Sequence, residues 1–260
     1  MRKTLLILLA LTLCLASCKT QYETLLNSND TSLKYDAAFK YFEEGKYQKA
    51  SQLFESMSIL TKGTERDDTV LYYLGLSNYR FKDYYTAQTN FETFLESYPR
   101  SPFAESASFL RLDCLYRGTY RYELDQTPTY EAITNINEFM MDYPQSEWRE
   151  VCVRMLDDLG ERLDRKAYEN AKLYYKMEDY KAARVALRNV LKDDADNIYR
   201  EDILYYTAMA SYKYAEMSVA EKQHERYLQF KDDYLNFIGE YPESKYAAEL
   251  GRIYKRVRDL

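Results

Sequence analysis

The sequence predicts an all-α protein built from repeated helix–turn–helix units. Its 260 residues include only 7 Gly and 5 Pro against 29 Tyr, and no segment shows the sustained apolar–polar alternation of a strand. Three stretches share one pattern, an amphipathic helix that ends in Tyr-Pro-x-Ser: FETFLESYPRS (91–101), INEFMMDYPQS (136–146) and YLNFIGEYPES (234–244). Proline ends a helix and the following serine can cap the next one, so these stretches mark unit boundaries.

A second set of stretches supplies the start of the second helix in a unit. EGKYQKASQLFE (44–55), FKDYYTAQTNFE (81–92) and MEDYKAARVALR (177–188) each give a polar turn, an aromatic residue, an alanine and an apolar residue four positions later. VLYYLGLSNY (70–79) and ILYYTAMASY (203–212) also match each other closely. Together these patterns resemble the tetratricopeptide repeat, a helix–turn–helix of about 34 residues.

The repeat divides the chain into about five units and a capping helix. We predict units at 31–64, 68–101, about 102–145, 164–197 and about 199–242, then a helix at 245–258. The third unit carries an insertion near RGTYRYELDQTPT, and the helices of the fifth run long. Each unit places small residues where its helices cross and apolar residues beside them. These are Ala38, Tyr41, Ala50 and Phe54; Leu74, Gly75, Ala87 and Phe91; Ala132 and Ile136; Ala171, Tyr174, Ala183 and Leu187; and Ala208. Five units in tandem favour this solenoid over an irregular helical bundle.

The N-terminal segment predicts export. Arg2 and Lys3 precede the apolar run Leu5–Ala16, which has 12 residues. A membrane-spanning helix needs ~20 residues, whereas a run of this length fits the core of a signal peptide.

The end of this segment predicts lipid attachment. Leu15-Ala16-Ser17-Cys18 resembles the lipobox of bacterial lipoproteins, which implies cleavage before Cys18 and addition of diacylglycerol and a fatty acyl chain to it. Cys14 is a poorer candidate because the bulky Leu13 precedes it. The alternative is an ordinary secretory peptide with an incidental cysteine. We therefore expect a signal peptide at 1–17 and a lipidated tether at 18–30.

Charge and residue inventory exclude several classes of function. Loss of Arg2 and Lys3 leaves 34 basic and 42 acidic residues, a net charge of −8, which argues against a nucleic-acid binder. His224 is the only histidine, no Cys-x-x-Cys or His-x-x-x-His occurs, and the seven glycines are widely spaced. These features argue against metal sites, phosphate loops and catalysis, so we expect no enzyme activity and no metal. Cys114 and Cys152 either pair in an oxidising compartment or are buried free thiols, and their helical, partly apolar contexts favour free thiols.

Stacked helix pairs create an extended concave face that binds peptides or partner domains. The inward positions of the first helices are Tyr35, Phe39 and Phe42 in unit one and Thr69, Tyr72, Leu76, Tyr79 and Arg80 in unit two. Tyrosine suits such a face because its ring is rigid and its hydroxyl forms hydrogen bonds. Any single tyrosine can instead pack between repeats, but the stripe as a whole favours a binding groove.

The whole mature chain, about residues 18–258, resembles the BamD family of outer-membrane-assembly lipoproteins. The lipobox, the repeat count, YELDQTPTYEAI (122–133) and RKAYENAKLYYKMEDYKAARVALRNVLKD (165–193) carry the resemblance. It implies a non-enzymatic protein on the periplasmic face of the outer membrane, with no cofactor beyond the lipid on Cys18. Such proteins bind the periplasmic domains of BamA and other assembly subunits, and help to recruit, fold and insert nascent β-barrel proteins.

The resemblance also assigns surfaces by repeat geometry. Repeats 1–3, residues 31–145, form the substrate side, and repeats 4–5 with the capping helix, residues 146–260, form the BamA side. The implied peptide-binding residues are Tyr35, Phe39, Tyr72, Leu76, Tyr79 and Arg80. The implied BamA-binding residues are Arg184, Arg188 and Asn189. The fourth repeat departs from the pattern because it ends in KDDADN rather than Tyr-Pro-x-Ser, so its junction is expected to be more flexible.

Two other functions remain open from the sequence. One is a periplasmic repeat adaptor in peptidoglycan or division-linked envelope maintenance, although residues 20–30 are too short for the coiled coil that such proteins often carry. The other is a glycan-capturing surface lipoprotein, which needs a large insertion that this chain lacks.

Overall fold

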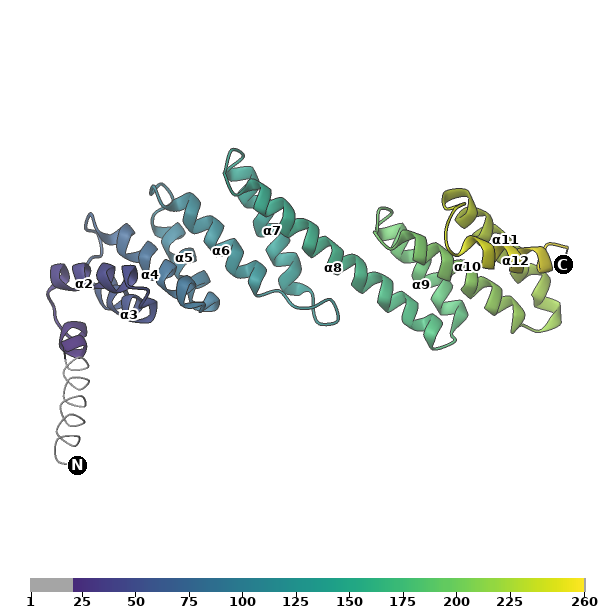
Figure 1. The fold of residues 1–260 in the computed structure, drawn as a ribbon, viewed down its shortest axis with the longest axis horizontal. Helices are drawn as coiled ribbons and strands as arrows, with labels where there is room; N and C mark the ends of the chain where they lie inside the picture. Colours follow the sequence, from purple (N-terminus) through teal and green to yellow (C-terminus); the bar gives the residue numbers. More distant parts are fainter. Residues whose placement is uncertain (1–20, 260) are drawn as a thin grey trace, which may run out of the picture. The chain divides into compact units, whose positions relative to one another are not determined.

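The computed structural model describes residues 21–259, and every regular element in this range is an α-helix (Figure 1). The helices are α2 (Thr31–Glu43), α3 (Tyr47–Ser58), α4 (Asp67–Phe81), α5 (Tyr84–Ser97), α6 (Ala104–Arg117), α7 (Thr127–Asp142), α8 (Arg149–Lys176), α9 (Tyr180–Asp193), α10 (Arg200–Glu216), α11 (Ala220–Glu240) and α12 (Ala247–Val257). A short helical segment at 21–26 precedes them. Within each compact unit, consecutive helices pack against each other, which confirms the predicted all-α solenoid. The predicted signal peptide and Cys18 lie outside the described residues.

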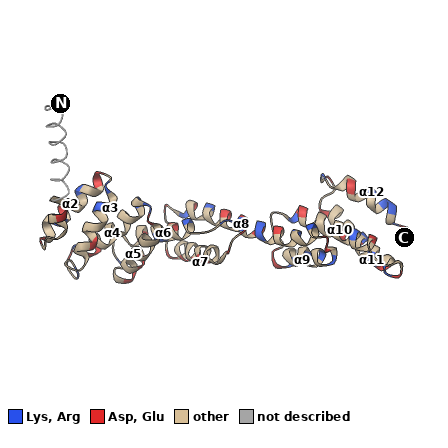
Figure 2. Ribbon diagram, turned by 90° about the horizontal axis from the view of Figure 1, so that it is seen from below, with Lys and Arg blue, Asp and Glu red and all other residues tan. Residues whose placement is uncertain are grey.

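The chain divides into two compact units. The N-terminal unit extends to Tyr120 and resumes over Thr127–Val153, whereas the C-terminal unit comprises Arg121–Gln126 and the chain from Arg154 onward. Within the N-terminal unit, α2 to α7 pack in sequence order. Within the C-terminal unit, α8 to α12 pack in the same manner around their own apolar clusters. Charged residues of both signs occur along the helices of each unit (Figure 2).

Small residues lie where paired helices cross, as the repeat pattern predicts. Ala38, Ala50 and Ala87 have no exposed surface. Gly75 of α4 lies so close to α5 that an added Cβ would be 2.8 Å from Cε1 of Phe91. The close approach of the helices therefore depends on the absence of side-chain bulk at these positions.

A polar residue forms a local hydrogen bond in each connection between units. The hydroxyl oxygens of Ser101, Ser146 and Ser244 accept hydrogen bonds from the backbone N–H two residues further on, at 3.3, 3.2 and 3.0 Å. At the first junction the hydroxyl oxygen of Thr64 accepts such a bond at 3.3 Å. At the fourth junction the side-chain amide oxygen of Asn197 accepts one at 3.0 Å. The predicted serine caps are not formed, because the N-cap residues of α6 and α12 are Phe103 and Tyr246, which have no side-chain cap hydrogen bond. Each serine instead bonds the N–H of the N-cap residue and so stabilises the turn before the helix, and the asparagine of KDDADN does the same before α10.

The residue two positions after each of these polar residues packs on an aromatic ring of the preceding unit. Four of these contacts are ring stacks with interplanar angles between 9° and 12°, and the first is a guanidinium over a ring. The pairs, with their distances to the ring centroid, are Arg66–Tyr35 (4.7 Å), Phe103–Tyr72 (4.5 Å), Trp148–Phe109 (4.8 Å), Tyr199–Tyr168 (5.0 Å) and Tyr246–Tyr205 (3.9 Å). Each junction therefore has one local side-chain hydrogen bond and one contact with an aromatic ring.

The fourth repeat begins earlier than the sequence predicts. α8 is a continuous helix of 28 residues from Arg149, although we predicted a unit starting at residue 164. No proline interrupts the segment, and its one glycine, Gly160, has open space around it. The predicted insertion is the loop between α6 and α7, where Nζ of Lys166 donates to the carbonyls of Tyr122 and Leu124, at 3.1 and 2.7 Å.

The remaining expectations on the fold concern the C-terminal helices and the cysteines. α10 and α11 have 17 and 21 residues, and α12 supplies the expected capping helix. Cys114 and Cys152 are buried free thiols. Among residues 21–259, no helix combines the length and apolar character needed to cross a bilayer.

Candidate peptide and partner surfaces

Five aromatic side chains form a continuous strip in the N-terminal unit. The ring centroids of Tyr35 and Phe39 lie 4.7 Å apart, and those of Phe39 and Tyr73 lie 4.6 Å apart. Tyr73 is 5.4 Å from Tyr72, which stacks on Phe103 at 4.5 Å. We call these five residues the aromatic strip. All except Tyr72 keep part of their surface exposed, so the strip presents ring faces and edges to a ligand.

Two tyrosines of α4 use their hydroxyl groups to bind α6. Oη of Tyr72 lies 2.8 Å from Oγ of Ser106, and Tyr79 donates to Oδ2 of Asp113 at 2.6 Å. Nε of Arg117 donates to the same carboxylate at 2.5 Å, which satisfies this buried charge. Burial and the bond to Asp113 raise the pKa of Tyr79 to about 12, so its hydroxyl stays protonated near neutral pH. The hydroxyls are thus occupied, and of the two rings only that of Tyr79 keeps part of its surface exposed.

The predicted peptide-binding residues all lie on α2 or α4. Tyr35, Phe39 and Tyr72 belong to the aromatic strip. Leu76 and Tyr79 are partly buried against the same apolar cluster as Tyr72. Arg80 is exposed and has no ion-pair partner among residues 21–259. The structure thus brings three of the six into one strip, and peptide binding by all six stays a prediction.

The structure adds Tyr73, Phe103 and Arg66 to this surface. Phe103 follows the serine of a Tyr-Pro-x-Ser stretch by two positions, as Trp148 and Tyr246 do. That spacing was visible in the sequence and identifies the stacking residue. Tyr73 carried no comparable signal, because it lies beside Tyr72 and only packing places its ring against Phe39 and Phe42.

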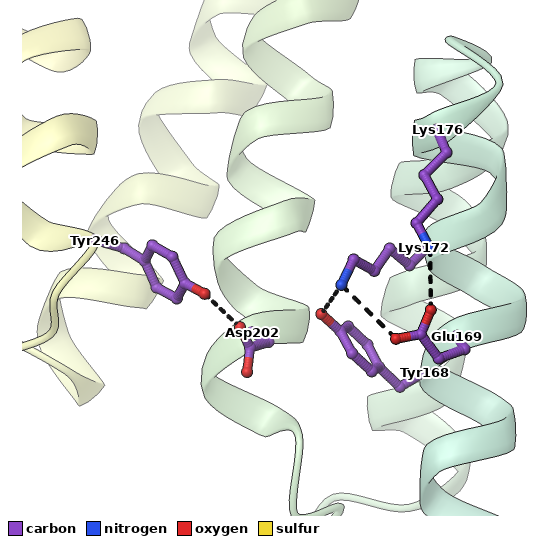
Figure 3. A network of polar contacts seen from close by, with 6 residues as sticks. All are labelled: Tyr168, Glu169, Lys172, Lys176, Asp202 and Tyr246. Carbon is purple, nitrogen blue, oxygen red and sulfur yellow. Dashed lines mark hydrogen bonds and ion pairs between the residues drawn. The ribbon is translucent and has the colours of Figure 1, made fainter.

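In the C-terminal unit, polar contacts join side chains of α8 to one another and join α10 to the residue before α12 (Figure 3). Nζ of Lys172 donates to Oη of Tyr168 at 2.8 Å and lies 3.8 Å from Glu169, which Lys176 also contacts at 3.1 Å. On α10, Asp202 accepts a hydrogen bond from Tyr246 at 2.6 Å. Desolvation raises the pKa of Tyr168, so this hydroxyl remains a neutral hydrogen-bonding group. The C-terminal unit thus combines these polar contacts with its own series of tyrosine ring contacts, so both units carry aromatic rings along their first helices; the rings are those of Tyr168, Tyr199, Tyr205, Tyr206 and Tyr246.

A cleft of about 530 Å³ opens among α9, α10 and α11 in the C-terminal unit. It contains two of the three residues predicted to bind BamA, Arg184 and Arg188, whereas Asn189 is exposed on α9 outside the lining. The lining residues are Arg184, Arg188, Leu191, Lys192, Ala195, Arg200, Leu204, Thr207, Asp232, Asp233 and Asn236.

The cations of this cleft differ in their availability. Arg184 binds Asp233 through two hydrogen bonds, at 2.7 and 3.3 Å, and Arg200 binds Glu240 at 2.8 Å. Arg188 and Lys192, four residues apart on α9, have no ion-pair partner within residues 21–259. The α9 rim of the cleft is therefore the part suited to an acidic group of a partner.

Comparison with known families gives one match. The model of the family YfiO, described as an outer membrane lipoprotein, matches residues 27–228. The matched range contains the aromatic strip and the α9 rim of the cleft. No curated protein matches the chain.

Proposed function

Because the chain belongs to the YfiO family of outer membrane lipoproteins, we propose that it is a non-enzymatic, BamD-like subunit of the β-barrel assembly machinery. Cys18 carries diacylglycerol and a fatty acyl chain, which attach the protein to the periplasmic face of the outer membrane. The attachment is firm because several acyl chains anchor a protein far more strongly than one does. The observation that carries the proposal is the aromatic strip, a surface suited to unfolded barrel strands.

The substrate of the strip is an extended segment of a nascent barrel protein. Barrel strands alternate apolar and polar side chains and carry aromatic residues near both membrane interfaces. Alternate side chains of an extended strand lie ~7 Å apart on one face. Aromatic rings attract each other at centroid separations of about 4.5–7 Å. One face of such a segment therefore interleaves with the rings of the strip, while its backbone remains free for later sheet pairing.

Peptide binding tests this assignment. Changing Tyr35 or Phe39 to Ala removes ring contacts, and we expect each change to weaken binding of a C-terminal barrel peptide about 3- to 10-fold. Changing Tyr72 to Phe should leave binding unchanged, because its hydroxyl already lies against Ser106. Tyr85→Ala is the matched control, since Tyr85 is 84% exposed on α5. Equal binding by all four variants would contradict the assignment.

The partner surface is the α9 rim of the cleft in the C-terminal unit. An acidic side chain of BamA binds Arg188 and Lys192, the two cations of the cleft that have no carboxylate partner among residues 21–259. Arg188→Glu should reverse this attraction and reduce complex formation, whereas Lys181→Glu on the same helix should not. Arg184 is a poor test position, because its loss leaves Asp233 without its cation.

The decisive experiment is a mild-detergent pull-down of the tagged, acylated protein from outer membranes, with crosslinking and mass spectrometry. Recovery of a large barrel protein with periplasmic domains, crosslinked near residues 180–192, would support the proposal. Recovery of peptidoglycan or division proteins without a barrel-assembly partner would overturn it and favour the envelope adaptor.

A further inference from the structure

A second pocket lies at the N-terminal end of the described chain. Its volume is about 500 Å³. Residues of the 21–26 helical segment form one wall, and α2 with the start of α3 forms the other. The lining residues are Gln21, Tyr22, Thr24, Leu25, Ser28, Leu33, Tyr41, Lys46 and Lys49.

The polar side of this pocket combines two lysines with two tyrosine rings. Nζ of Lys49 lies 5.0 Å from the centroid of Tyr22 and 5.4 Å from that of Tyr41, and Nζ of Lys46 lies 5.6 Å from the ring of Tyr41. Tyr22 donates to Oε1 of Gln52 at 2.7 Å, which fixes the helical segment against α3. Lys46 binds Glu44 at 2.6 Å, whereas Lys49 has no carboxylate partner among residues 21–259. The pocket therefore holds an ammonium group that forms no direct ion pair within residues 21–259, although Glu44 interacts with it electrostatically.

The apolar side of the pocket is partly open to solvent. Leu33 is 54% exposed at the start of α2, and Leu25 is half-buried against the core of the first repeat. Lysine and tyrosine beside apolar side chains are the residues that accumulate where a protein meets lipid headgroups, since their stems and rings lie in the apolar layer and their polar ends in water.

The length of chain before the pocket limits its distance from the membrane. Only two residues separate Gln21 from Cys18. A fully extended chain spans at most ~3.6 Å per residue, so the Cα of Gln21 lies within ~11 Å of the Cα of Cys18. When Cys18 is acylated, the rim of the pocket is therefore held within about one Debye length of the bilayer surface.

We propose that this pocket docks on the bilayer and binds the phosphate of an anionic phospholipid headgroup. Lys46 and Lys49 contact the phosphate, and Leu33 lies against the glycerol and upper acyl region. The docking orients the first repeat at the membrane, which a lipid anchor alone does not achieve. The inference rests on acylation of Cys18 and is independent of the barrel-assembly role.

Site-selective fluorescence quenching tests the docking. The acylated protein carries a fluorophore at Gln48→Cys, an exposed site between the two lysines, or at Asn137→Cys on α7 as a control. Native Cys114 and Cys152 stay unlabelled because they are buried and burial raises the pKa of each, for Cys114 to about 12. Each protein is placed in nanodiscs of phosphatidylethanolamine with or without phosphatidylglycerol, containing lipid with a spin label on the headgroup.

We expect headgroup quenching at position 48 to exceed that at position 137 at least threefold, and to require phosphatidylglycerol. One lysine near an anionic surface changes the docked-to-undocked ratio by roughly fivefold, so Lys46→Gln with Lys49→Gln should change it roughly thirtyfold at low salt. The pair Lys181→Gln and Lys222→Gln, both exposed in the C-terminal unit, is the matched control and should leave quenching unchanged.

Three results would overturn the proposal. Equal quenching at the two sites means that the pocket does not face the bilayer. Stronger quenching by tail-labelled than by headgroup-labelled lipid means that position 48 lies among the acyl chains and not at the phosphate. Mass spectrometry that finds Cys18 unacylated removes the tether from which the proximity follows. The first two results leave the outcome of the pull-down unchanged, because the pull-down tests barrel assembly separately.

Discussion

Replacing Gly75 with Ala tests the contact that defines the second repeat. Gly75 is buried in α4 at the crossing with α5, and its backbone approaches the ring of Phe91. A methyl group at this position would lie 2.8 Å from Cε1 and 2.9 Å from Cδ1 of that ring. Both distances are well below the ~3.5–4.0 Å of optimal carbon–carbon contact. The side chain of Phe91 has no exposed surface, so the strain must be taken up by moving α4 away from α5.

The expected magnitude combines two opposing effects. Overpacking of a core costs about 1–3 kcal/mol. Replacing glycine with alanine inside a helix contributes about 1 kcal/mol of stabilisation. We therefore expect Gly75→Ala to lower the free energy of unfolding of the N-terminal unit by about 0–2 kcal/mol.

Gly160→Ala is the matched control because only the helix-propensity effect applies there. Gly160 lies inside α8, and a Cβ at this position would meet no atom within 4 Å. We expect this variant to be stabilised by up to about 1 kcal/mol. The same chemical change should thus have opposite signs at the two positions.

Urea denaturation followed by two probes measures both effects. Trp148 is the only tryptophan and stacks on Phe109, so its fluorescence follows the N-terminal unit, whereas far-ultraviolet circular dichroism follows all helices. In a Phe91→Leu background the cost of Gly75→Ala should fall, giving a coupling energy of about 0.5–3 kcal/mol. Stabilisation by Gly75→Ala equal to that by Gly160→Ala, or zero coupling to Phe91, would refute the steric argument.

Three further changes probe polar contacts of the fold. Tyr98→Phe removes a 2.5 Å hydrogen bond to the buried Asp67 and should cost about 1.5–3 kcal/mol in a denaturation experiment, whereas the exposed Tyr85→Phe should cost nothing measurable. Tyr79 has a folded-state pKa raised to about 12, so its contribution to stability is complete below the unfolded value of about 10 and is lost as the pH rises towards 12. In Tyr79→Phe this part of the alkaline decline in melting temperature should disappear, and an unchanged decline would contradict the assignment. Asp233→Ala leaves its arginine on α9 without a carboxylate and should cost about 2–4 kcal/mol in thermal unfolding, more than Asp232→Ala.

The sequence was most informative about helix boundaries and crossings. Each of α5, α7 and α11 ends two residues before the proline of its Tyr-Pro pair, and the serine that follows forms a local hydrogen bond in the turn before the next helix. Such signals act within a few residues, so they can be identified without knowledge of the packing. The same holds for the alanines and Gly75 at the crossings, because a helix pair tolerates little bulk there.

Sequence reasoning was less complete for the candidate surfaces. It identified Tyr35, Phe39 and Tyr72 from repeat positions, but not that Tyr73 and Phe103 join them into one strip. It also grouped Arg184 with Arg188, although Arg184 forms an ion pair with Asp233 of α11 and Arg188 does not. The partners that distinguish these residues lie on other helices, and repeat geometry predicts the direction of a side chain but not what lies opposite.

By itself the sequence determined the fold class, the order of the repeats and the chemistry available on each helix, because helix period, turn residues and small crossing positions are local properties of the chain. It also carries the candidate lipidation site at Cys18. The tertiary structure decided which groups remain available: it binds the hydroxyl of Tyr79 to Asp113, continues α8 through residues 149–176, and places Lys49 beside the rings of Tyr22 and Tyr41. These contacts join residues on separate helices, where packing and desolvation, not local propensity, select the partner.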